Sequence, residues 1–316
     1  MDLNNFLRNI PNNLIVSPVP HVRAAITTRK IMLRVIIAML PAVIASVIIF
    51  GPRAFAVEAV TVGSCVLLEF LWCTLRHEEP LWKDLSAVVT GLLLAFNLPA
   101  SIPLYIPVIG SVVAIIVAKQ FFGGIGKNFA NPAIVARITL AVSFPSLMTA
   151  YTYPKPYVPC DAISSATPLG VTTDIPFMDL FLGTHGGVIG ETCALALLIG
   201  FVYLVATGTI DFTIPVVFVG SVALFSLIAG QNVVQQIFSG GLLLGAIFMA
   251  TDYVTSPFTR KGKIIFALGC GIITSVIRFY GNMNEGVSYS ILLMNLLVPF
   301  INAKTRKVPM GGKVKK

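Results

Sequence analysis

Charged residues are scarce in this sequence. They make up 11% of its 316 residues, whereas a soluble domain carries about 25%. Hydrophobic residues make up 56%, and apolar windows of about 18 to 20 residues recur along the chain, each long enough to cross about 30 Å of hydrocarbon as a helix. The alternating segments of about 10 residues that typify a membrane β-barrel are missing. The composition therefore excludes a soluble domain and predicts an all-α polytopic membrane protein.

Motifs for metals and nucleotides are missing as well. The five cysteines form no CxxC pair and show no metal-ligand spacing with the three histidines, so we predict no metal site. The glycine-rich segments at 123–133 and 183–192 match neither a Walker motif nor GxGxxG. They offer free backbone N–H groups before helix starts, where an anion can bind. The net charge of +9 comes from basic residues at helix ends and in the C-terminal tail, which favours contact with the lipid bilayer over nucleic acid.

The apolar pattern predicts about ten transmembrane helices, of which the third and eighth are short. They are expected at 31–50, 54–75, 85–100, 103–119, 131–149, 190–207, 211–229, 240–253, 262–280 and 287–303. If the N-terminus is cytoplasmic, nearly all of the 22 Lys and Arg residues fall on the cytoplasmic side. Only Arg53, Lys155 and Arg278 then lie outside, and Arg137 lies within the fifth span. The positive-inside rule therefore predicts that both termini are cytoplasmic.

Two pairs of segments within the chain resemble each other. VVTGLLLAF at 88–96 resembles FSGGLLLGAIF at 238–248, and QFFGG at 120–124 resembles RFYGN at 278–282. An odd number of helices per half forces the second half to run in the opposite sense, so we predict two inverted five-helix repeats. The expected organisation is a cytoplasmic segment at 1–30, the first repeat at 31–149, an outer loop at 150–189, the second repeat at 190–303 and a basic cytoplasmic tail at 304–316.

Inverted repeats are a transporter architecture, in which broken helices near the midplane mark a site. The segments NLPASIP at 97–103 and ATDYVTSP at 250–257 are the candidate breaks, one in each half. Asp252 lies at the second break and is a candidate for ion coupling.

A polar stripe runs along the second predicted span. A charge at mid-membrane costs about 2.5–3.5 kcal/mol and needs a reason. Helical spacing places the stripe residues on one face, which we expect to point into the bundle; they are Glu58, Thr61, Cys65, Glu69 and Trp72. For Glu58, interhelical hydrogen bonding is the favoured interpretation. For Glu69 and Asp252, a structural role and a role in ion or proton passage both stay open.

The longest polar segment is the expected outer loop, which contains DAISSATP at 161–168. Structureless connections longer than about 12–15 residues are usually functional or disordered. Five prolines limit the flexibility of this loop and favour a function; they are Pro154, Pro156, Pro159, Pro168 and Pro176. The hydroxyl of Thr167 can be esterified, and Pro168 biases Thr167 toward an extended backbone.

DAISSATP resembles the signature at which a flavin transferase links FMN through its phosphate to a threonine. Further stretches agree with the same family: VSPVPHVR at 16–23, DLSAVVTGLLLAFNLP at 84–99, AKQFFGGIGKNFANPA at 118–133, GGVIGET at 186–192, FMATDYVTSP at 248–257 and VSYSILLMNLLVPFIN at 287–302. Nearly the whole chain thus resembles the family that comprises the D subunit of the Rnf complex and the B subunit of the sodium-pumping NADH:quinone reductase. The short segment before the first span favours the Rnf branch.

The resemblance implies FMN bound covalently to Thr167. The accompanying motif residues are Asp161, Ser164, Ser165 and Ala166, and Ser165 departs from the glycine that the family usually has. We expect the backbone amides of GGVIGET, with Gly187, Gly190 and Glu191, to receive the phosphate or a flavin carbonyl. Arg278, at the end of the ninth span, either pairs with the flavin or anchors the helix at the interface. The resemblance also implies a second, non-covalent flavin, riboflavin, whose position the sequence does not give.

The resemblance implies a flavin-carrying subunit of an ion-translocating ferredoxin:NAD⁺ oxidoreductase, multi-pass in the bacterial cell (inner) membrane, with the flavin loop outside. It would pass electrons through FMN and contribute to Na⁺ or H⁺ transport, without a catalytic side chain of its own. Its expected partners are other Rnf subunits, especially the FMN-bearing G subunit and the membrane A and E subunits, and a flavin transferase during maturation. The alternatives are a secondary transporter or channel without a redox cofactor and a cofactor-free scaffold.

Overall fold

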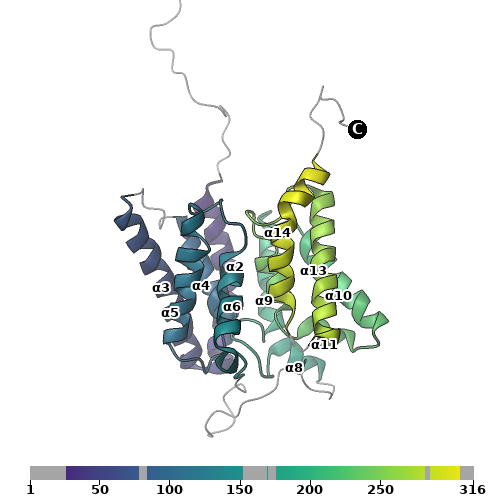
Figure 1. The fold of residues 1–316 in the computed structure, drawn as a ribbon. Helices are drawn as coiled ribbons and strands as arrows, with labels where there is room; N and C mark the ends of the chain where they lie inside the picture. Colours follow the sequence, from purple (N-terminus) through teal and green to yellow (C-terminus); the bar gives the residue numbers. More distant parts are fainter. Residues whose placement is uncertain (1–25, 78–83, 152–168, 170–175, 282–284, 307–316) are drawn as a thin grey trace, which may run out of the picture.

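The computed structural model describes residues 26–77, 84–151, 169, 176–281 and 285–306 (Figure 1). Over these ranges the secondary structure is helical, and five helices are long and apolar enough to cross a membrane. Four further apolar helices of 10–17 residues lie among them. The prediction of an all-α polytopic membrane protein is confirmed. The count of ten spans and their division into inverted repeats stay predictions.

Each of the five spans predicted in the first half of the chain contains a helix. The helices are α2 (Thr28–Phe50), α3 (Pro52–Leu75), α4 (Ser86–Phe96), α5 (Tyr105–Val112) with its π-helical continuation η2 (Val113–Val117), the short η3 (Gln120–Phe122), α6 (Pro132–Ser143) and α7 (Pro145–Met148). Side-chain caps fix two of the starts, because Thr27 accepts a hydrogen bond from the N–H of Lys30 and Asn131 accepts one from the N–H of Ala133. The fifth span was expected to be continuous over 131–149, which is wrong. It breaks at Phe144 before Pro145, since a residue that precedes proline disfavours the helical conformation.

The second half contains more short helices than the sequence predicts. Its elements are α8 (Phe177–Leu182), α9 (Ala194–Ala206), α10 (Thr213–Ile228), α11 (Val233–Phe238), α12 (Leu242–Leu244) with its π-helical continuation η5 (Gly245–Met249), α13 (Arg260–Tyr280) and α14 (Val287–Thr305). Helix α8 falls inside the expected outer loop. It is held against α11 by a cluster of three rings, Phe177, Phe181 and Phe238.

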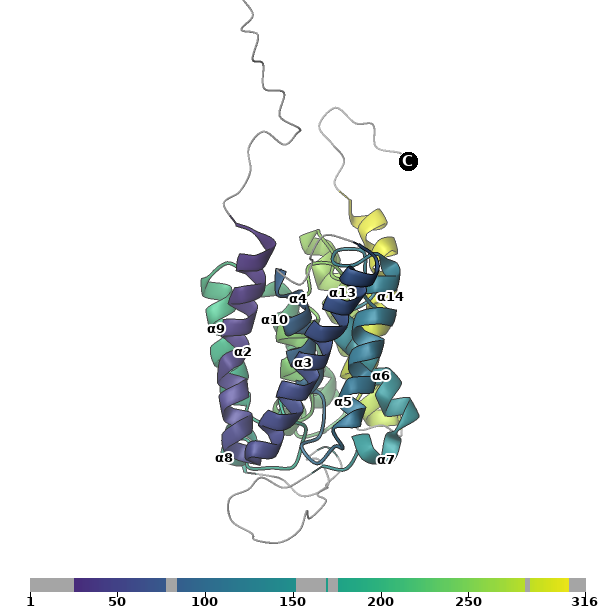
Figure 2. The same cartoon turned by 90° about the vertical axis from the view of Figure 1, so that its left-hand side faces the viewer.

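The long helices run side by side, with the first half of the chain on one side of the bundle and the second half on the other (Figure 1). Helix α2 begins and α14 ends at the same end of the bundle, which we call the terminal side. The opposite end, where α7 and α8 lie (Figures 1 and 2), is called the loop side.

Both predicted helix breaks are present. Residues 97–104 interrupt the chain between α4 and α5, and residues 250–259 interrupt it between η5 and α13. At the first break, the carbonyl of Phe96 accepts a hydrogen bond from the N–H of Gly190 (3.0 Å), and that of Leu98 accepts one from the N–H of Ile189 (3.1 Å). Gly190 is required here because a β-carbon would collide with the Phe96 ring. The loop before α9 therefore supplies partners that α4 lacks where it ends.

The two halves also meet where α2 packs on α9. Gly200 of α9 faces the carbonyl of Ala38 and the ring of Phe248, with no room for a β-carbon. Nearby, the guanidinium of Arg34 donates to the carbonyl of Thr207 at the C-terminus of α9 (3.2 Å). A cation at this end of a helix is favourable, so the contact fixes α9 along α2.

Gly200→Val is expected to destabilise the protein by about 1–3 kcal/mol, because the new side chain forces α2 and α9 apart. The measurement is the midpoint of thermal unfolding of the purified protein in detergent, followed by tryptophan fluorescence. Gly220→Val is the matched control, since Gly220 is exposed on α10 with no atom near its β-carbon position. Equal midpoints for the two variants would show that the α2–α9 contact does not constrain the fold.

Candidate functional site

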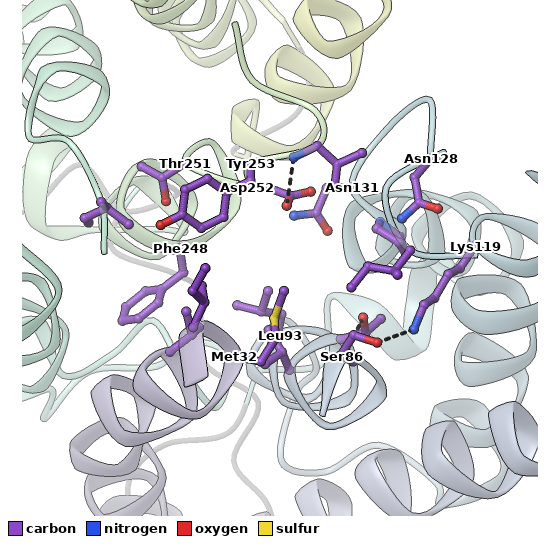
Figure 3. Close-up of a pocket in the computed structure, with 18 of the residues that line it drawn as sticks. Met32, Ser86, Leu93, Lys119, Asn128, Asn131, Phe248, Thr251, Asp252 and Tyr253 are labelled. Carbon is purple, nitrogen blue, oxygen red and sulfur yellow. Dashed lines mark hydrogen bonds between the residues drawn. The ribbon is translucent and has the colours of Figure 1, made fainter. Parts of the chain in front are cut away.

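A pocket lies between the two halves (Figure 3), and Ile31 and Met32 of its lining stand at the start of α2, on the terminal side. We call it the terminal-side pocket. Its walls come from α2, α4, α9, η5, the segment that precedes α6 and the break after η5. Its lining residues are Ile31, Met32, Val35, Ser86, Val89, Thr90, Leu93, Lys119, Ile125, Asn128, Asn131, Pro132, Leu204, Ile210, Ile247, Phe248, Thr251, Asp252, Tyr253 and Val254. The lining is mainly apolar, with one cation and one carboxylate among a few polar groups.

The two charges in the pocket wall each follow a π-helical segment. Lys119 lies two residues after η2, and Asp252 lies three residues after η5. Figure 3 shows the two side chains on different walls of the pocket. Because π-helical insertions are frequent at functional sites, this arrangement marks the pocket as a candidate site.

Lys119 belongs to a buried polar network. Its Nζ donates to Oε1 of Glu69 (2.5 Å) and to Oγ of Ser86 (2.6 Å), and Ser86 in turn donates to Asp84 (2.6 Å). Gln120 donates to the same oxygen of Glu69 (3.0 Å). Glu69 is fully buried, and its second oxygen has no partner in the part of the chain that is described. The predicted inward stripe on α3 is thus confirmed, with Glu58, Thr61, Cys65 and Glu69 buried and Trp72 partly buried.

Asp252 lies in different surroundings. Its carboxylate accepts hydrogen bonds from the hydroxyl of Thr255 (3.1 Å) and the N–H of Val254 (3.4 Å). No Lys or Arg of the described ranges forms an ion pair with it. Across the pocket, Asn131 donates to the carbonyl of Met249 (3.3 Å), whereas the buried carbonyl oxygen of the Asn128 side chain has no described partner. Asn128 and Asp252 are therefore open to a further polar partner.

A second group of charges gathers at the loop side, and we call it the loop-side cluster. It comprises Asn97, Arg137, Tyr151, Glu191, Arg278 and Glu285. Arg137 donates to the side-chain oxygen of Asn97 and pairs with Glu285. Tyr151 donates to Glu285 (3.4 Å). The cluster joins α6 to the first helix break and to the start of α14.

Glu191 and Arg278 approach the segment Gly240–Gly241 from two directions. A β-carbon at Gly241 would lie 3.4 Å from Oε2 of Glu191, and one at Gly240 would lie 3.0 Å from a guanidinium nitrogen of Arg278. Arg278 donates to the carbonyls of Gln236 (2.6 Å) and Ser239 (3.2 Å), while its buried Nε has no described partner. Oε2 of Glu191 is likewise buried and without a described partner.

The expectation that the GGVIGET amides receive a phosphate needs a correction. The N–H of Gly190 donates to Phe96 at the end of α4, and that of Ile189 donates to Leu98 in the break that follows. The N–H of Glu191 donates to the carbonyl of Val188, and that of Val188 donates to the carboxylate of Glu191. Gly187 packs against Thr192 and Glu191. These four amides serve the fold, whereas the buried Nε of Arg278 is an expected anion donor of the cluster that has no described partner.

The structure thus assigns the expected residues to two places. Gly187, Gly190, Glu191 and Arg278 lie together at the loop side, and Glu69 and Asp252 lie near the terminal-side pocket. The attachment motif, Asp161, Ser164, Ser165, Ala166 and Thr167, lies outside the described residues. Sequence reasoning missed a set of polar partners, Asn97, Lys119, Asn128, Asn131, Arg137 and Glu285. The one available signal was Arg137, a lone charge in an apolar span.

No group of three or more potential metal ligands occurs in the described ranges. Cys65, Cys73 and Cys270 are buried thiols, and Cys193 is partly buried. Cys65 packs with Ala87 and Ile115 in a core cluster of its own, as a small apolar residue does.

Comparisons with known proteins assign the chain to a family. Residues 15–311 match the model of the NQR2, RnfD, RnfE family. The chain is 48% identical to the D subunit of the Na(+)-translocating ferredoxin:NAD(+) oxidoreductase complex of Acetobacterium woodii, over 96% of this chain and 98% of that protein. It is 40% identical to the D subunit of the proton-translocating ferredoxin:NAD(+) oxidoreductase complex of Clostridium ljungdahlii, over 95% of this chain and 97% of that protein. It is 37% identical to the D subunit of the ion-translocating oxidoreductase complex of Stutzerimonas stutzeri, over 89% of this chain and 92% of that protein. This chain therefore belongs to the NQR2, RnfD, RnfE family.

Proposed function

We propose that this chain is the flavin-carrying membrane subunit of an Rnf-type ion-translocating ferredoxin:NAD⁺ oxidoreductase. Its family, its relatives and its membrane helices support this assignment. The observation that carries the flavin is the position of Leu169, whose side chain lies 2.9 Å from where a β-carbon of Gly240 would stand, beside Arg278. Thr167 precedes Leu169 by only two positions.

The covalent FMN, on this proposal, is joined to Thr167 and meets the loop-side cluster. Two residues of chain span at most about 7 Å, so a group on Thr167 is within reach of Arg278 from the place where Leu169 packs. The free Nε of Arg278 would donate to a phosphodiester or to a flavin oxygen, and such charge-assisted bonds are strong. The other guanidinium nitrogens are held by α11, so Arg278 is already oriented toward the loop side. Bound FMN would supply one-electron transfer.

The terminal-side pocket fits the second, non-covalent flavin. A flavin ring has one apolar edge and one edge of alternating donors and acceptors. The apolar lining, with the rings of Phe248 and Tyr253, suits the first edge. The open side-chain oxygen of Asn128 and the carboxylate of Asp252, whose oxygens each accept one hydrogen bond from the chain, suit the second. Such a mixture is usual for small-molecule sites, which are mostly apolar with a few placed polar groups. Riboflavin is therefore our proposed ligand for this pocket.

Ion transport is the other part of the proposal. Asp252 is a carboxylate at a helix break, among hydroxyl oxygens that suit a hard cation. Glu69 is already neutralised by Lys119, so it is the weaker candidate for direct ion binding.

Basic residues gather on the terminal side, as at Arg29, Lys30 and Arg34 of α2 and at Arg260 and Lys261 of α13. By the positive-inside rule we assign this side, and hence both termini, to the cytoplasm.

Assignment to an Rnf-type complex implies partner subunits. The relatives are named as D subunits of oxidoreductase complexes, and such complexes contain several chains. We propose that the FMN-bearing G subunit exchanges electrons with the flavin at the loop side, outside the cell membrane. The membrane A and E subunits would contact the helical surface, and a flavin transferase would act on Thr167 during maturation.

Thr167→Ala is expected to abolish the covalent flavin, because esterification requires the hydroxyl. Fluorescence of the denatured gel band and the mass of the intact polypeptide measure the loss, and Thr167→Ser should retain part of the signal. Thr172→Ala, in the same loop, is the matched control and should keep full fluorescence. An FMN-sized mass increment that survives Thr167→Ala would refute the attachment site. A wild-type band without flavin would favour the cofactor-free transporter.

Asn128→Leu is expected to lower the amount of flavin released by denaturation at least several-fold, because it removes the open polar partner in the pocket. The covalent flavin of the same sample is the internal standard, so the measured quantity is the ratio of released to covalent flavin. An unchanged ratio would exclude Asn128 from flavin binding. Loss of both flavins together would indicate misfolding, which a size-exclusion profile detects.

Asp252→Asn is expected to leave the covalent flavin in place and to reduce the number of ions moved per electron. The asparagine oxygen can still accept from the N–H of Val254 and its amide nitrogen can donate to the hydroxyl of Thr255, so both contacts that hold the break remain while the negative charge is removed. The measurement is ion uptake into sealed vesicles during electron transfer by the whole complex, with Na⁺ and H⁺ followed separately. A normal ratio of ions to electrons in this variant would refute the coupling role.

A further inference from the structure

Glu58 is a buried acid that the proposed electron and ion chemistry does not use. It lies on α3 near the loop side, and 3% of its surface is exposed. One carboxyl oxygen contacts the hydroxyl of Ser46 on α2 at 2.7 Å. The other oxygen is buried and has no partner in the described ranges.

The contacts of the Ser46 hydroxyl depend on whether Glu58 carries a proton. Its Oγ lies 2.7 Å from Oε1 of Glu58 and also 2.7 Å from the carbonyl oxygen of Val43. A serine hydroxyl has one hydrogen, and a backbone carbonyl has none to donate. If the glutamate is ionised, one of the two contacts joins two oxygen atoms with no hydrogen between them. If it is protonated, Glu58 donates to Ser46 and Ser46 donates to Val43, so both contacts become hydrogen bonds.

The surrounding charges agree with a neutral acid. On α3 itself, the nearest cation is Arg53, whose guanidinium donates to the carbonyl of Ile102 (3.0 Å). Helix α2 carries its basic residues at the far, terminal end, and α4 carries no ionisable residue. Helix α5 offers only Tyr105, which is exposed. No described cation therefore compensates a carboxylate at Glu58, and an unpaired buried charge is unfavourable.

Glu69, on the same face of α3, differs from Glu58 because a cation compensates its charge. It lies eleven positions later, about 16 Å along the axis, and is paired with Lys119. The three hydrogens of the Lys119 ammonium are sufficient for both Glu69 and Ser86, so no proton on Glu69 is needed to complete this network.

We infer that Glu58 is a proton-binding site, occupied in the resting protein, in the loop-side half of the α2–α3 pair. On release, the proton passes to water at the loop side, and the O–H bond of the acid breaks. The hydroxyl of Ser46 then turns from the carbonyl of Val43 to the new carboxylate, which keeps one hydrogen bond. The site is thus built to exchange a proton with little movement of the backbone.

Infrared difference spectroscopy of the full chain in lipid vesicles tests this inference at neutral pH. Wild type minus Glu58→Gln is expected to show one carbonyl band of an undissociated carboxylic acid that shifts in D₂O. Ser46→Ala keeps the acid but removes its hydrogen-bond acceptor, so the same band should move to higher frequency. This second variant keeps the test valid if Glu58→Gln folds poorly.

Glu69→Gln is the matched control, because it changes a buried glutamate of the same helix that is paired with a lysine. Its difference spectrum is expected to show loss of carboxylate bands and no loss in the acid region. The inference is overturned if Glu58→Gln removes carboxylate bands and leaves the acid region unchanged. It is equally overturned if the acid band of the wild type keeps its frequency in Ser46→Ala.

Discussion

A helix that stops in the buried interior of a bundle must find hydrogen-bond partners for its terminal carbonyls, and this requirement organises the molecule. Within hydrocarbon, every unsatisfied backbone group costs several kcal/mol. Helix α4 stops at Phe96, and the N–H groups of Ile189 and Gly190, almost a hundred residues away, satisfy its end. The first half of the chain therefore depends on a loop of the second half for a stable break, and the two halves form one unit.

Side chains around the two breaks also form hydrogen bonds to buried polar groups, but some buried polar atoms nearby have no described partner. Asn97 accepts from Arg137 at the first break, and Asn131 donates to the carbonyl of Met249 at the second. Around these satisfied groups, Arg278, Glu191 and Asn128 each keep a buried polar atom without a described partner. Native proteins leave few such atoms, so each one calls for an explanation. The two flavins proposed above would supply partners to the open atoms of Arg278 and Asn128.

The sequence predicts local features of this protein well and long-range ones poorly. The apolar windows, the inward stripe of α3 and both helix breaks follow from periodicity and from Pro, Gly and Asn, which act within a few residues. The use of the 188–191 amides was predicted wrongly, because two of them donate to Phe96 and Leu98, more than 90 positions earlier, and glycine spacing alone carries no information about these partners. The role of Lys119 could not be predicted either, because its partner Glu69 lies 50 positions earlier in the chain.

The position of Lys119 connects the pocket to the buried polar stripe. Its ammonium forms part of the pocket wall and at the same time neutralises Glu69. In a medium of low effective dielectric constant, two charges a few ångströms apart interact by several kcal/mol. A negative charge that enters the pocket would therefore compete with Glu69 for Lys119, so one ammonium group links the charge in the pocket to the buried stripe on α3.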